Sequence, residues 1–429
     1  MQQLPNTPPK GTSDWFPEEF KVRKHIFDTW RQVCLSYGFE EYLGPMVESI
    51  DIWKAKSGED VGGSELTEIT DRNGELSGLA IRPEMTPTVT RMVSRKWKEI
   101  EKPVKWFSIA NFYRNEKPQK GRNREFWQLN ADIFGEESLR ADIEALTLSL
   151  ELLRAFNPPV GSYKLKINHR QLISGFLSEV LGVADIEQQK SITRLLDKYE
   201  KLKRDDFKKL LLEINESIDM QSVEDFMEAK NITDLQKSFK ELSGSESFVA
   251  FKEIIETLGN LGYAEEIEFS GSLIRGFDYY DGMIFEMFDT NTDNPRALFG
   301  GGRYNGLADI FGVKGGISAV GFAPGDETMK LFLEGHDLLS DIQNEHSKKY
   351  YFPLLEEELF ENMQILANTL RKQGKNVLLG LSPKKLGKAI QAASKSNYSH
   401  IVIFGVEEKT AGIMKIKNLK TGEEETYKI

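Results

Sequence analysis

The sequence is poor in the residues that build covalent frameworks and metal clusters. It has one cysteine, Cys34, in 429 residues. No disulfide framework and no multi-cysteine zinc site can therefore form within the chain. The five histidines are scattered, and none has the spacing of a metal-binding pair. No apolar run approaches the roughly 18 residues of a membrane span, and no signal peptide is visible. We expect a cytoplasmic protein with no membrane partner.

Two nucleotide-binding motifs and one motif of catalytic serines are also missing. The glycines at 300–302 precede Arg303-Tyr-Asn-Gly306, so the lysine and hydroxyl residue of a P-loop are absent. The spacing of the dinucleotide fingerprint is absent as well. No Gly-x-Ser-x-Gly segment occurs, and Cys34 lies in a helical context that favours a core position. The three glycines permit close approach to a ligand, but they equally suit a loose turn.

The composition is that of a folded protein with more than one domain. Hydrophobic residues make up 39% and charged residues 29% of the 429 positions, which predicts two or three domains. The net charge of −11 excludes a uniformly basic nucleic-acid binder, but not a local basic face. Residues 346–429 hold 14 basic and 9 acidic side chains, so a small basic unit follows an acidic body.

The basic C-terminal unit has an alternating pattern of strands and helices. Apolar runs predict strands at 350–354, 376–381 and 400–406, and a helical stripe covers 355–370. A second helix is expected to open at Ser382-Pro383, with the serine as cap and the proline in the first turn. The polar stretch 334–348 indicates a linker before this unit. The pattern predicts an α/β domain of about 80 residues.

A second zone, at about 170–265, is rich in lysine, glutamate and leucine. Residues 189–204 have the periodicity of one amphipathic helix. Two to four helices here would make an inserted module. A solvated helical spacer is the alternative, because charged helices are common.

The most informative stretch is a predicted hairpin of two strands, at 104–114 and 126–134. Alternation places the side chains of Phe126, Gln128, Asn130 and Asp132 on one face of the second strand. The opposite face is apolar and must meet a core. The connecting turn is rich in arginine and lysine, and arginines beside an aromatic ring suit a nucleotide. A solvated basic hairpin is the alternative.

Two shorter segments carry further polar groups. Residues 272–281 contain Arg275-Gly276, followed by an aspartate and two tyrosines, ahead of a strand at 283–288. The alternative for this segment is a strand entry with exposed polar side chains. Residues 81–86 offer Glu84 and Thr86 at a turn set by a proline.

These residues together resemble class II aminoacyl-tRNA synthetases, and specifically the histidyl-tRNA synthetase family. Leu273-Ile-Arg-Gly-Phe-Asp-Tyr-Tyr280 resembles a signature peculiar to histidyl enzymes. Residues 112–128 resemble motif 2, and residues 37–45 resemble motif 1, whose proline, here Pro45, lies at a dimer interface. The resemblance also covers segments 9–14, 301–306 and 319–325 and extends over nearly the whole chain.

The resemblance implies an α+β catalytic domain with a mostly antiparallel sheet of six or seven strands. It implies a class II catalytic core at 1–170 and 263–333, a helical insertion at 171–262 and an anticodon-binding domain at 347–429. The implied activity is histidine–tRNA ligase, with histidine, ATP and histidine tRNA as substrates. A homodimer and Mg²⁺ are implied as well, although no Mg²⁺ ligand is identified.

The resemblance assigns roles to individual residues. Arg114 and Arg275 would be catalytic, placed opposite each other at the reacting phosphate. The nucleotide would be held by Arg114, Glu116, Arg122 and Phe126, with the phenyl ring stacked on adenine. Histidine would be bound by Glu84, Thr86, Arg114, Gln128, Asp132, Arg275, Tyr279, Tyr280 and Tyr304.

Three departures from the family pattern bear on the activity. Thr328 stands where motif 3 usually has an arginine that grips the terminal phosphate. Lys117 replaces a common arginine, and Asp132 a common glutamate. The first departure favours an alternative, a non-catalytic relative that serves as regulatory subunit of ATP phosphoribosyltransferase. The retained Arg114, Arg122 and Arg275 favour the ligase, as does the C-terminal unit, which regulatory relatives generally lack.

Overall fold

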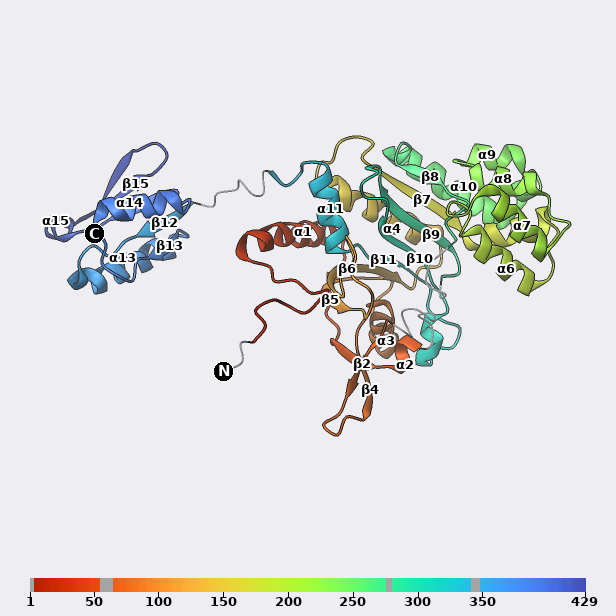
Figure 1. Ribbon diagram of the computed structural model, residues 1–429, viewed down its shortest axis with the longest axis horizontal. Helices are drawn as coiled ribbons and strands as arrows, with labels where there is room; N and C mark the ends of the chain where they lie inside the picture. Colours follow the sequence, from red (N-terminus) through yellow and green to blue (C-terminus); the bar gives the residue numbers. More distant parts are fainter. Residues whose placement is uncertain (1–3, 55–64, 275–279, 341–347) are drawn as a thin grey trace. The chain divides into compact units, whose positions relative to one another are not determined.

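The structure is a computed structural model that describes residues 4–54, 65–274, 280–340 and 348–429 (Figure 1). The chain divides into two compact units, Met1–Leu339 and Ser340–Ile429. The predicted linker at 334–348 lies partly outside the described residues. Its first residues belong to a helix, α11, which ends at Gly335. No described helix is long and apolar enough to cross a membrane.

The first unit is built on a mostly antiparallel sheet. In the described residues it has eight strands in the order β1-β5-β6-β11-β10-β9-β7-β8. The two edge pairs, β1 with β5 and β7 with β8, are parallel, and every pairing between β5 and β7 is antiparallel. The strands are β1 Glu40–Glu41, β5 Val104–Tyr113, β6 Glu125–Phe134, β7 Tyr163–His169, β8 Ile267–Phe269, β9 Met283–Asp289, β10 Ala297–Arg303 and β11 Ala319–Phe322.

This sheet confirms the predicted fold class and adds edge strands. The six antiparallel strands match the expected six or seven. The short edge strands β1 and β8 were not visible in the sequence, because two or three residues carry no alternation to detect.

One face of the sheet is covered by helices. α1 (Pro17–Ser36), α4 (Leu139–Arg154) and α11 (Asp326–Gly335) pack on one another and on β6, β10 and β11. Trp127, on the apolar face of β6, lies 5.4 Å from the ring of Phe27 in α1. Cys34 is buried in the same helix, as its sequence context predicts. The polar face of β6 is therefore turned away from these helices.

The N-terminal part of the first unit also contains a second, smaller sheet and two helices. The sheet has the order β2-β4-β3, from β2 Val47–Ser49, β3 Thr67–Thr70 and β4 Leu76–Ile81. α2 (Asp51–Lys54) and α3 (Thr86–Lys96) flank it, and the 3-10 helix η5 (Leu307–Phe311) packs on α3.

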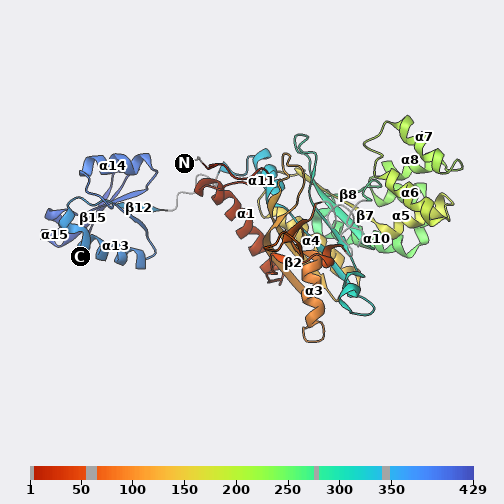
Figure 2. The same ribbon diagram turned by 60° about the horizontal axis from the view of Figure 1, so that its bottom comes forward.

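The segment between β7 and β8 is a packed helical module, not a spacer. Both views place its helices at one end of the unit, beyond β7 and β8 (Figures 1 and 2). The rings of Phe176 and Phe226 stack 4.1 Å apart, and Phe239 packs edge-on against Phe176. Its elements are α5 Arg170–Gly175, η2 Phe176–Val180, α6 Ile186–Leu196, α7 Arg204–Ile214, α8 Met220–Glu228, α9 Ile232–Ser238, η3 Leu242–Gly244, α10 Glu246–Leu258 and η4 Gly259–Tyr263.

Two expectations for this module were wrong. The described part contains six α-helices where two to four were expected. The single helix predicted at 189–204 ends at Leu196, and α7 starts at Arg204. The intervening residues turn because Tyr199 is drawn into the module core, where its ring meets Phe207 edge-on at 5.0 Å. Tertiary packing has overridden a continuous helical pattern.

The C-terminal unit is the predicted α/β domain. Its sheet has the order β13-β12-β14-β15-β16, with parallel pairs around β12 and antiparallel pairs beyond β14. The elements are β12 Lys349–Phe352, η6 Glu357–Leu359, α13 Phe360–Lys372, β13 Asn376–Leu379, α14 Leu386–Lys395, β14 His400–Ile403, α15 Val406–Ala411, β15 Ile413–Asn418 and β16 Glu424–Lys428. The helix expected to be capped by Ser382 starts three residues later, with Lys385 at the cap position, because the Lys384 backbone N–H bonds to the carbonyl of Leu354.

Candidate active site

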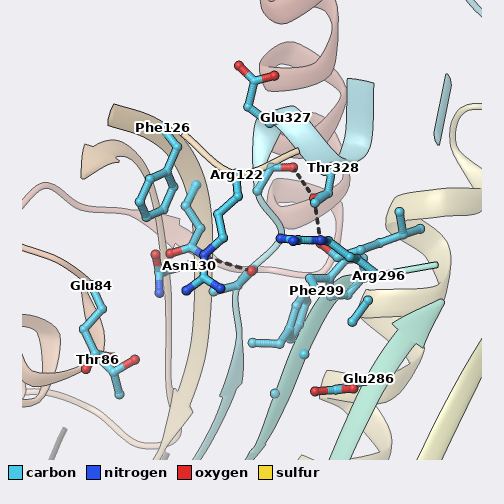
Figure 3. Close-up of a pocket in the computed structure, with 18 of the residues that line it drawn as sticks. Glu84, Thr86, Arg122, Phe126, Asn130, Glu286, Arg296, Phe299, Glu327 and Thr328 are labelled. Atoms are coloured by element: carbon cyan, nitrogen blue, oxygen red, sulfur yellow. Dashed lines mark hydrogen bonds between the residues drawn. The ribbon is translucent and has the colours of Figure 1, made fainter. Parts of the chain in front are cut away.

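A cavity of about 950 Å³ opens on the polar face of the main sheet (Figure 3). Its walls come from β6, β9, β10 and β11, from the loop before α3, from the β5–β6 hairpin and from the first turn of α11. That volume suits a ligand of nucleotide size. The four β6 residues that alternation predicts to share a face all line it: Phe126, Gln128, Asn130 and Asp132.

The deep end of the pocket contains a buried carboxylate and a buried phenol. The hydroxyl of Tyr304 donates to Oδ1 of Asp132 at 2.6 Å, and both side chains are at most 2% exposed. Oδ2 of Asp132 is buried and has no hydrogen-bond partner among the described residues. Burial raises the pKa of Asp132 to about 7, the Tyr304 hydrogen bond opposes this rise, and the nearby Glu84 charge adds to it. This oxygen is positioned to accept a ligand N–H.

Glycines make room for this carboxylate. Gly321 of β11 pairs with Asp132 across the sheet, and a Cβ at Gly321 would clash with Oδ1 of Asp132. A Cβ at Gly302 would lie 2.9 Å from the ring of Tyr280. Gly300–Gly302 thus form part of strand β10, and the loose turn considered from the sequence is excluded.

The Asp132 end of the pocket has further polar groups from the start of α3, from β6 itself and from the segment before β9. Glu84, 2% exposed, and Thr86, 9% exposed, lie next to each other at the start of α3 (Figure 3). Gln128 donates from Nε2 to the carbonyl of Ala323 at 3.0 Å, which fixes its amide at the pocket wall. Tyr280 packs edge-on against Tyr304, with ring centroids 6.4 Å apart. This end offers acidic and hydroxyl groups suited to an ammonium and to ring N–H groups.

The other end of the pocket is built from arginines and an aromatic ring. Phe126 stacks on Phe112 at 5.7 Å between ring centroids. The guanidinium of Arg114 lies 5.1 Å from the Phe126 ring centroid, and its Nε donates to the carbonyl of Pro83 at 3.0 Å. The Arg114 side chain is therefore held at the wall by one nitrogen, which leaves its terminal nitrogens for a ligand.

The second predicted nucleotide-binding arginine is engaged by two carboxylates. Arg122 forms an ion pair with Glu116 and another with Glu65, whose Oε1 lies 3.3 Å from the Arg122 NH2 nitrogen. Burial raises the pKa of Glu116, and the charge of Arg122 offsets part of that rise. The three side chains form a network at the base of the hairpin that carries little uncompensated positive charge.

The first turn of α11 joins this pocket to the helical face of the sheet. Arg23 of α1 forms ion pairs with both Asp326 and Glu327, and Asp326 is fully buried. Thr328 points its hydroxyl at backbone carbonyls, with Oγ1 2.7 Å from the oxygen of Leu298 and 3.1 Å from that of Gly325. Thr328 therefore ties α11 to β10 and brings no charge to the pocket.

Two predicted site residues, Arg275 and Tyr279, lie outside the described residues. The other predicted site residues line the cavity and come from four separate segments of the chain: Glu84, Thr86, Arg114, Glu116, Arg122, Phe126, Gln128, Asp132, Tyr280 and Tyr304. The structure thus brings them together as one site.

Sequence reasoning missed several wall residues. Glu286 and Arg296, labelled in Figure 3, come from β9 and from the residue before β10. Strand alternation could have placed Glu286 on a ligand-facing side. Arg296 precedes an irregularity in the β9–β10 pairing, so alternation gives no side for it. Arg194 reaches the wall from the helical module, which no local pattern indicates.

The described residues contain no cluster of three or more potential metal ligands. Glu116 and Glu327 are carboxylates at the nucleotide end of the cavity. One or two carboxylates fit an Mg²⁺ ion that takes its remaining ligands from substrate phosphates and water.

The mostly antiparallel sheet, the basic hairpin with its aromatic ring and the buried acidic pocket agree with the resemblance to class II aminoacyl-tRNA synthetases. Residues 11–327 match the family model described as histidyl-tRNA synthetase, and residues 344–429 match an anticodon-binding domain. The chain belongs to the histidyl-tRNA synthetase family, whose enzymes use ATP as a substrate.

Individual relatives agree with this assignment. A histidine–tRNA ligase of Leptospira biflexa is 37% identical over 99% of this chain and 96% of its own length. The crystal structure of histidyl-tRNA synthetase from Nostoc sp. PCC 7120 has a TM-score of 0.81, with 22% identity over 99% of this chain and 97% of that one. A Bacillus halodurans structure described as an ATP phosphoribosyltransferase regulatory subunit/histidyl-tRNA synthetase has a TM-score of 0.73 and 22% identity, covering 94% of this chain and 98% of that one. These two structures bear on the fold alone.

Proposed function

We propose that this protein activates histidine with ATP and transfers the histidyl group to the 3′ end of histidine tRNA. The observation that carries the proposal is one cavity with two chemically different ends. A buried carboxylate–phenol pair stands at one end, and Arg114 with the Phe126 ring stands at the other. The relatives named histidine–tRNA ligase support it at full length.

In the first step an oxygen of the histidine carboxylate attacks the α-phosphorus of ATP. A C–O–P bond forms, the bond between the α-phosphorus and its bridging oxygen breaks, and pyrophosphate leaves with the electron pair. Two anions must approach each other, so cations at the reacting phosphate lower the barrier. Arg114 supplies such a cation from β5–β6, and Arg275 supplies the second in this proposal. Mg²⁺ bound to the phosphates neutralises part of the remaining charge.

The proposed orientation puts the histidine side chain at the deep end. Oδ2 of Asp132 accepts an imidazole N–H, with Tyr304, Tyr279 and Tyr280 around the ring. The ammonium group meets Glu84, Thr86 and Gln128. A site built to hydrogen-bond a ring N–H rejects analogues without it, because the buried carboxylate would then be left unpaired.

At the other end adenine stacks on Phe126, while Arg122 and Glu116 contact the nucleotide. Arg122 reaches the ligand by exchanging part of its contact with Glu65. After activation a ribose hydroxyl of the tRNA terminus attacks the carboxyl carbon of the adenylate. An ester bond forms, the acyl–phosphate bond breaks, and AMP leaves.

The remaining parts of the proposal concern the whole chain. Residues 347–429 contact the anticodon, supported by their basic balance and family match. The catalytic core comprises 1–170 and 263–333, with the insertion at 171–262 between its two parts. A homodimer is proposed because exposed apolar side chains gather on and beside the β2–β4 sheet near Pro45: Leu43, Met46, Val47, Leu76 and Leu79. We place the enzyme in the cytoplasm, with the translation machinery it supplies.

The test is histidine-dependent exchange of pyrophosphate into ATP by the purified full-length protein, followed by charging of tRNA. We expect both activities with histidine and neither with the other amino acids. Exchange that is absent, or that does not depend on histidine, would refute the ligase and favour a regulatory relative.

A further inference from the structure

In the proposed function the pocket binds a nucleoside triphosphate. The outer end of the cavity, where the β- and γ-phosphates would lie, must then hold several negative charges. ATP has three phosphates, and the cations proposed at the reacting centre contact only the α-phosphate. Phosphate groups in proteins are held by guanidinium or ammonium groups whose charge is not already matched by carboxylates. The described residues of the cavity wall include four arginines: Arg114, Arg122, Arg194 and Arg296.

Arg114 and Arg122 are each otherwise engaged. Arg114 belongs to the reacting centre. Arg122 contacts the nucleotide in the proposed function, but the carboxylates of Glu116 and Glu65 match its charge, so it brings no net cation to an outer phosphate. Arg23, near the first turn of α11, is likewise matched by Asp326 and Glu327. Thr328 brings no charge, since its hydroxyl is directed at two backbone carbonyls.

Arg296 has the charge and the position that the outer end needs. Among the described residues, its side chain donates one hydrogen bond, from NH2 to Oε1 of Gln119, a neutral amide in the β5–β6 hairpin. No carboxylate among the described residues forms an ion pair with it. The bond to Gln119 directs the guanidinium from the residue before β10 toward the hairpin, at the cavity wall.

Thr328 lies at the same corner, by two independent contacts. Its hydroxyl bonds to the carbonyl of Leu298, two residues after Arg296. Its methyl carbon is 3.9 Å from the point where a Cβ on Gly121, in the same hairpin, would stand. In Figure 3, Arg296 and Thr328 both lie on the side of the pocket away from Glu84 and Thr86.

We propose that Arg296 binds the terminal phosphate of ATP in this chain and so occupies the role that the arginine missing at Thr328 would have had. This inference rests on the proposed function, because it assigns a residue to that reaction's nucleotide. Two positions on different elements, the first turn of α11 and the start of β10, reach the same corner of the cavity. A cation from either one satisfies the phosphate, so a neutral residue at 328 is tolerated.

The experiment compares nucleotides that differ in the outer phosphates. Affinities for ATP and AMP are measured by calorimetry for wild type and Arg296→Gln, and the KM for histidine in pyrophosphate exchange is measured in parallel. Glutamine removes the charge and keeps a polar side chain. We expect the ATP dissociation constant to rise about 10-fold or more, since a charge-assisted contact is lost. AMP affinity and the histidine KM should change less than twofold.

Three further variants make the result specific. Arg140→Gln, an exposed arginine of α4 outside the cavity, is the matched control and should change neither affinity. Arg296→Gln combined with Thr328→Arg should recover ATP affinity to within a few-fold of wild type. Arg194→Gln tests the remaining wall arginine, and ATP affinity should stay within twofold.

The inference is overturned if Arg296→Gln leaves ATP affinity unchanged, or weakens AMP as much as ATP, which would indicate a structural role. It is also overturned if Arg194→Gln alone reproduces the loss, or if the double variant stays as weak as Arg296→Gln. Failure of the proposed function gives a different experimental result. In that case wild type shows no histidine-dependent exchange at all, whatever the variants do to ATP binding.

Discussion

The two ends of the cavity are built on different principles. At the Asp132 end the carboxylates of Asp132 and Glu84 are buried, and the geometry is fixed by strand pairing, by glycines and by a hydrogen bond from Tyr304. At the Phe126 end the arginines are partly exposed and are held by exchangeable contacts, such as the pair of Arg122 with Glu65. In the proposed function the rigid Asp132 end selects histidine, and the adaptable Phe126 end holds the phosphates of ATP.

The largest effect is expected where the two ends meet, at Arg114. Arg114→Ala removes a cation that acts where charge develops, so kcat for pyrophosphate exchange should fall by about 10²–10³-fold. The KM for histidine should change much less. A variant that keeps kcat within a few-fold and only weakens histidine would place Arg114 in ground-state binding instead. Single-turnover adenylate formation measures this directly.

The rigid end is tested by Asp132→Asn. The amide has nearly the same shape but no charge, so the bond to the imidazole N–H loses its charge assistance. The KM for histidine should rise about 10–100-fold while the KM for ATP stays within twofold. Steady-state exchange kinetics check this. An equal rise in both constants would mean that Asp132 supports the whole cavity and does not select the ring.

The same end should be intolerant of one methyl group. Gly321→Ala places a Cβ against Oδ1 of Asp132, so either β11 or the carboxylate must shift. We expect a loss of about 1–3 kcal/mol in the free energy of unfolding, with a several-fold rise in the KM for histidine. Gly244→Ala is the control, since its Cβ would meet nothing within 4 Å. Urea denaturation of both variants decides whether the close packing is real.

A smaller, pH-dependent effect follows from burying Asp132. Burial raises its pKa from 3.8, the ordinary value of an aspartate, to about 7, so the folded protein holds this proton more tightly than the unfolded chain. The resulting stability is fully present below about pH 4 and is lost as the pH rises to about 7. Asp132→Asn cannot titrate. Its unfolding free energy should therefore gain on wild type between pH 5 and pH 8, by at most about 3 kcal/mol. Identical pH dependence in both proteins would contradict the assigned burial.

The sequence predicted the two ends unequally. Alternation along 126–132 was enough to place Phe126, Gln128 and Asp132 on one face, because a strand with one apolar face has a defined register. Arg296 was not predictable, since its position depends on an irregular strand pairing and on a hairpin 170 or more residues away in the chain. Local patterns report which face a residue occupies, and not which distant element it meets.

The fold shows the same limit. The antiparallel core and the C-terminal α/β unit followed from long strands and clear periodicity. The end of α6 at Leu196 could not be predicted, because the apolar periodicity continues past it. Tyr199 lies in that continuation, but its ring is buried in the core of the module and the helix does not extend to it. Short edge strands such as β1 carry too few residues for any pattern. Each of these features is decided by tertiary contacts.

The proposed function places histidine and ATP at opposite ends of the polar face of β6. A double-mutant cycle is the most direct test of this arrangement. Phe126 and Asp132 are six residues apart on β6, about 20 Å at the rise of a strand. Histidine and ATP affinities are measured for wild type, Phe126→Ala, Asp132→Asn and the double variant. We expect Phe126→Ala to weaken the binding of ATP alone and Asp132→Asn to weaken the binding of histidine alone, with effects that add within about 0.5 kcal/mol. Both ligands weakened by each single change, or a strongly non-additive double variant, would contradict it.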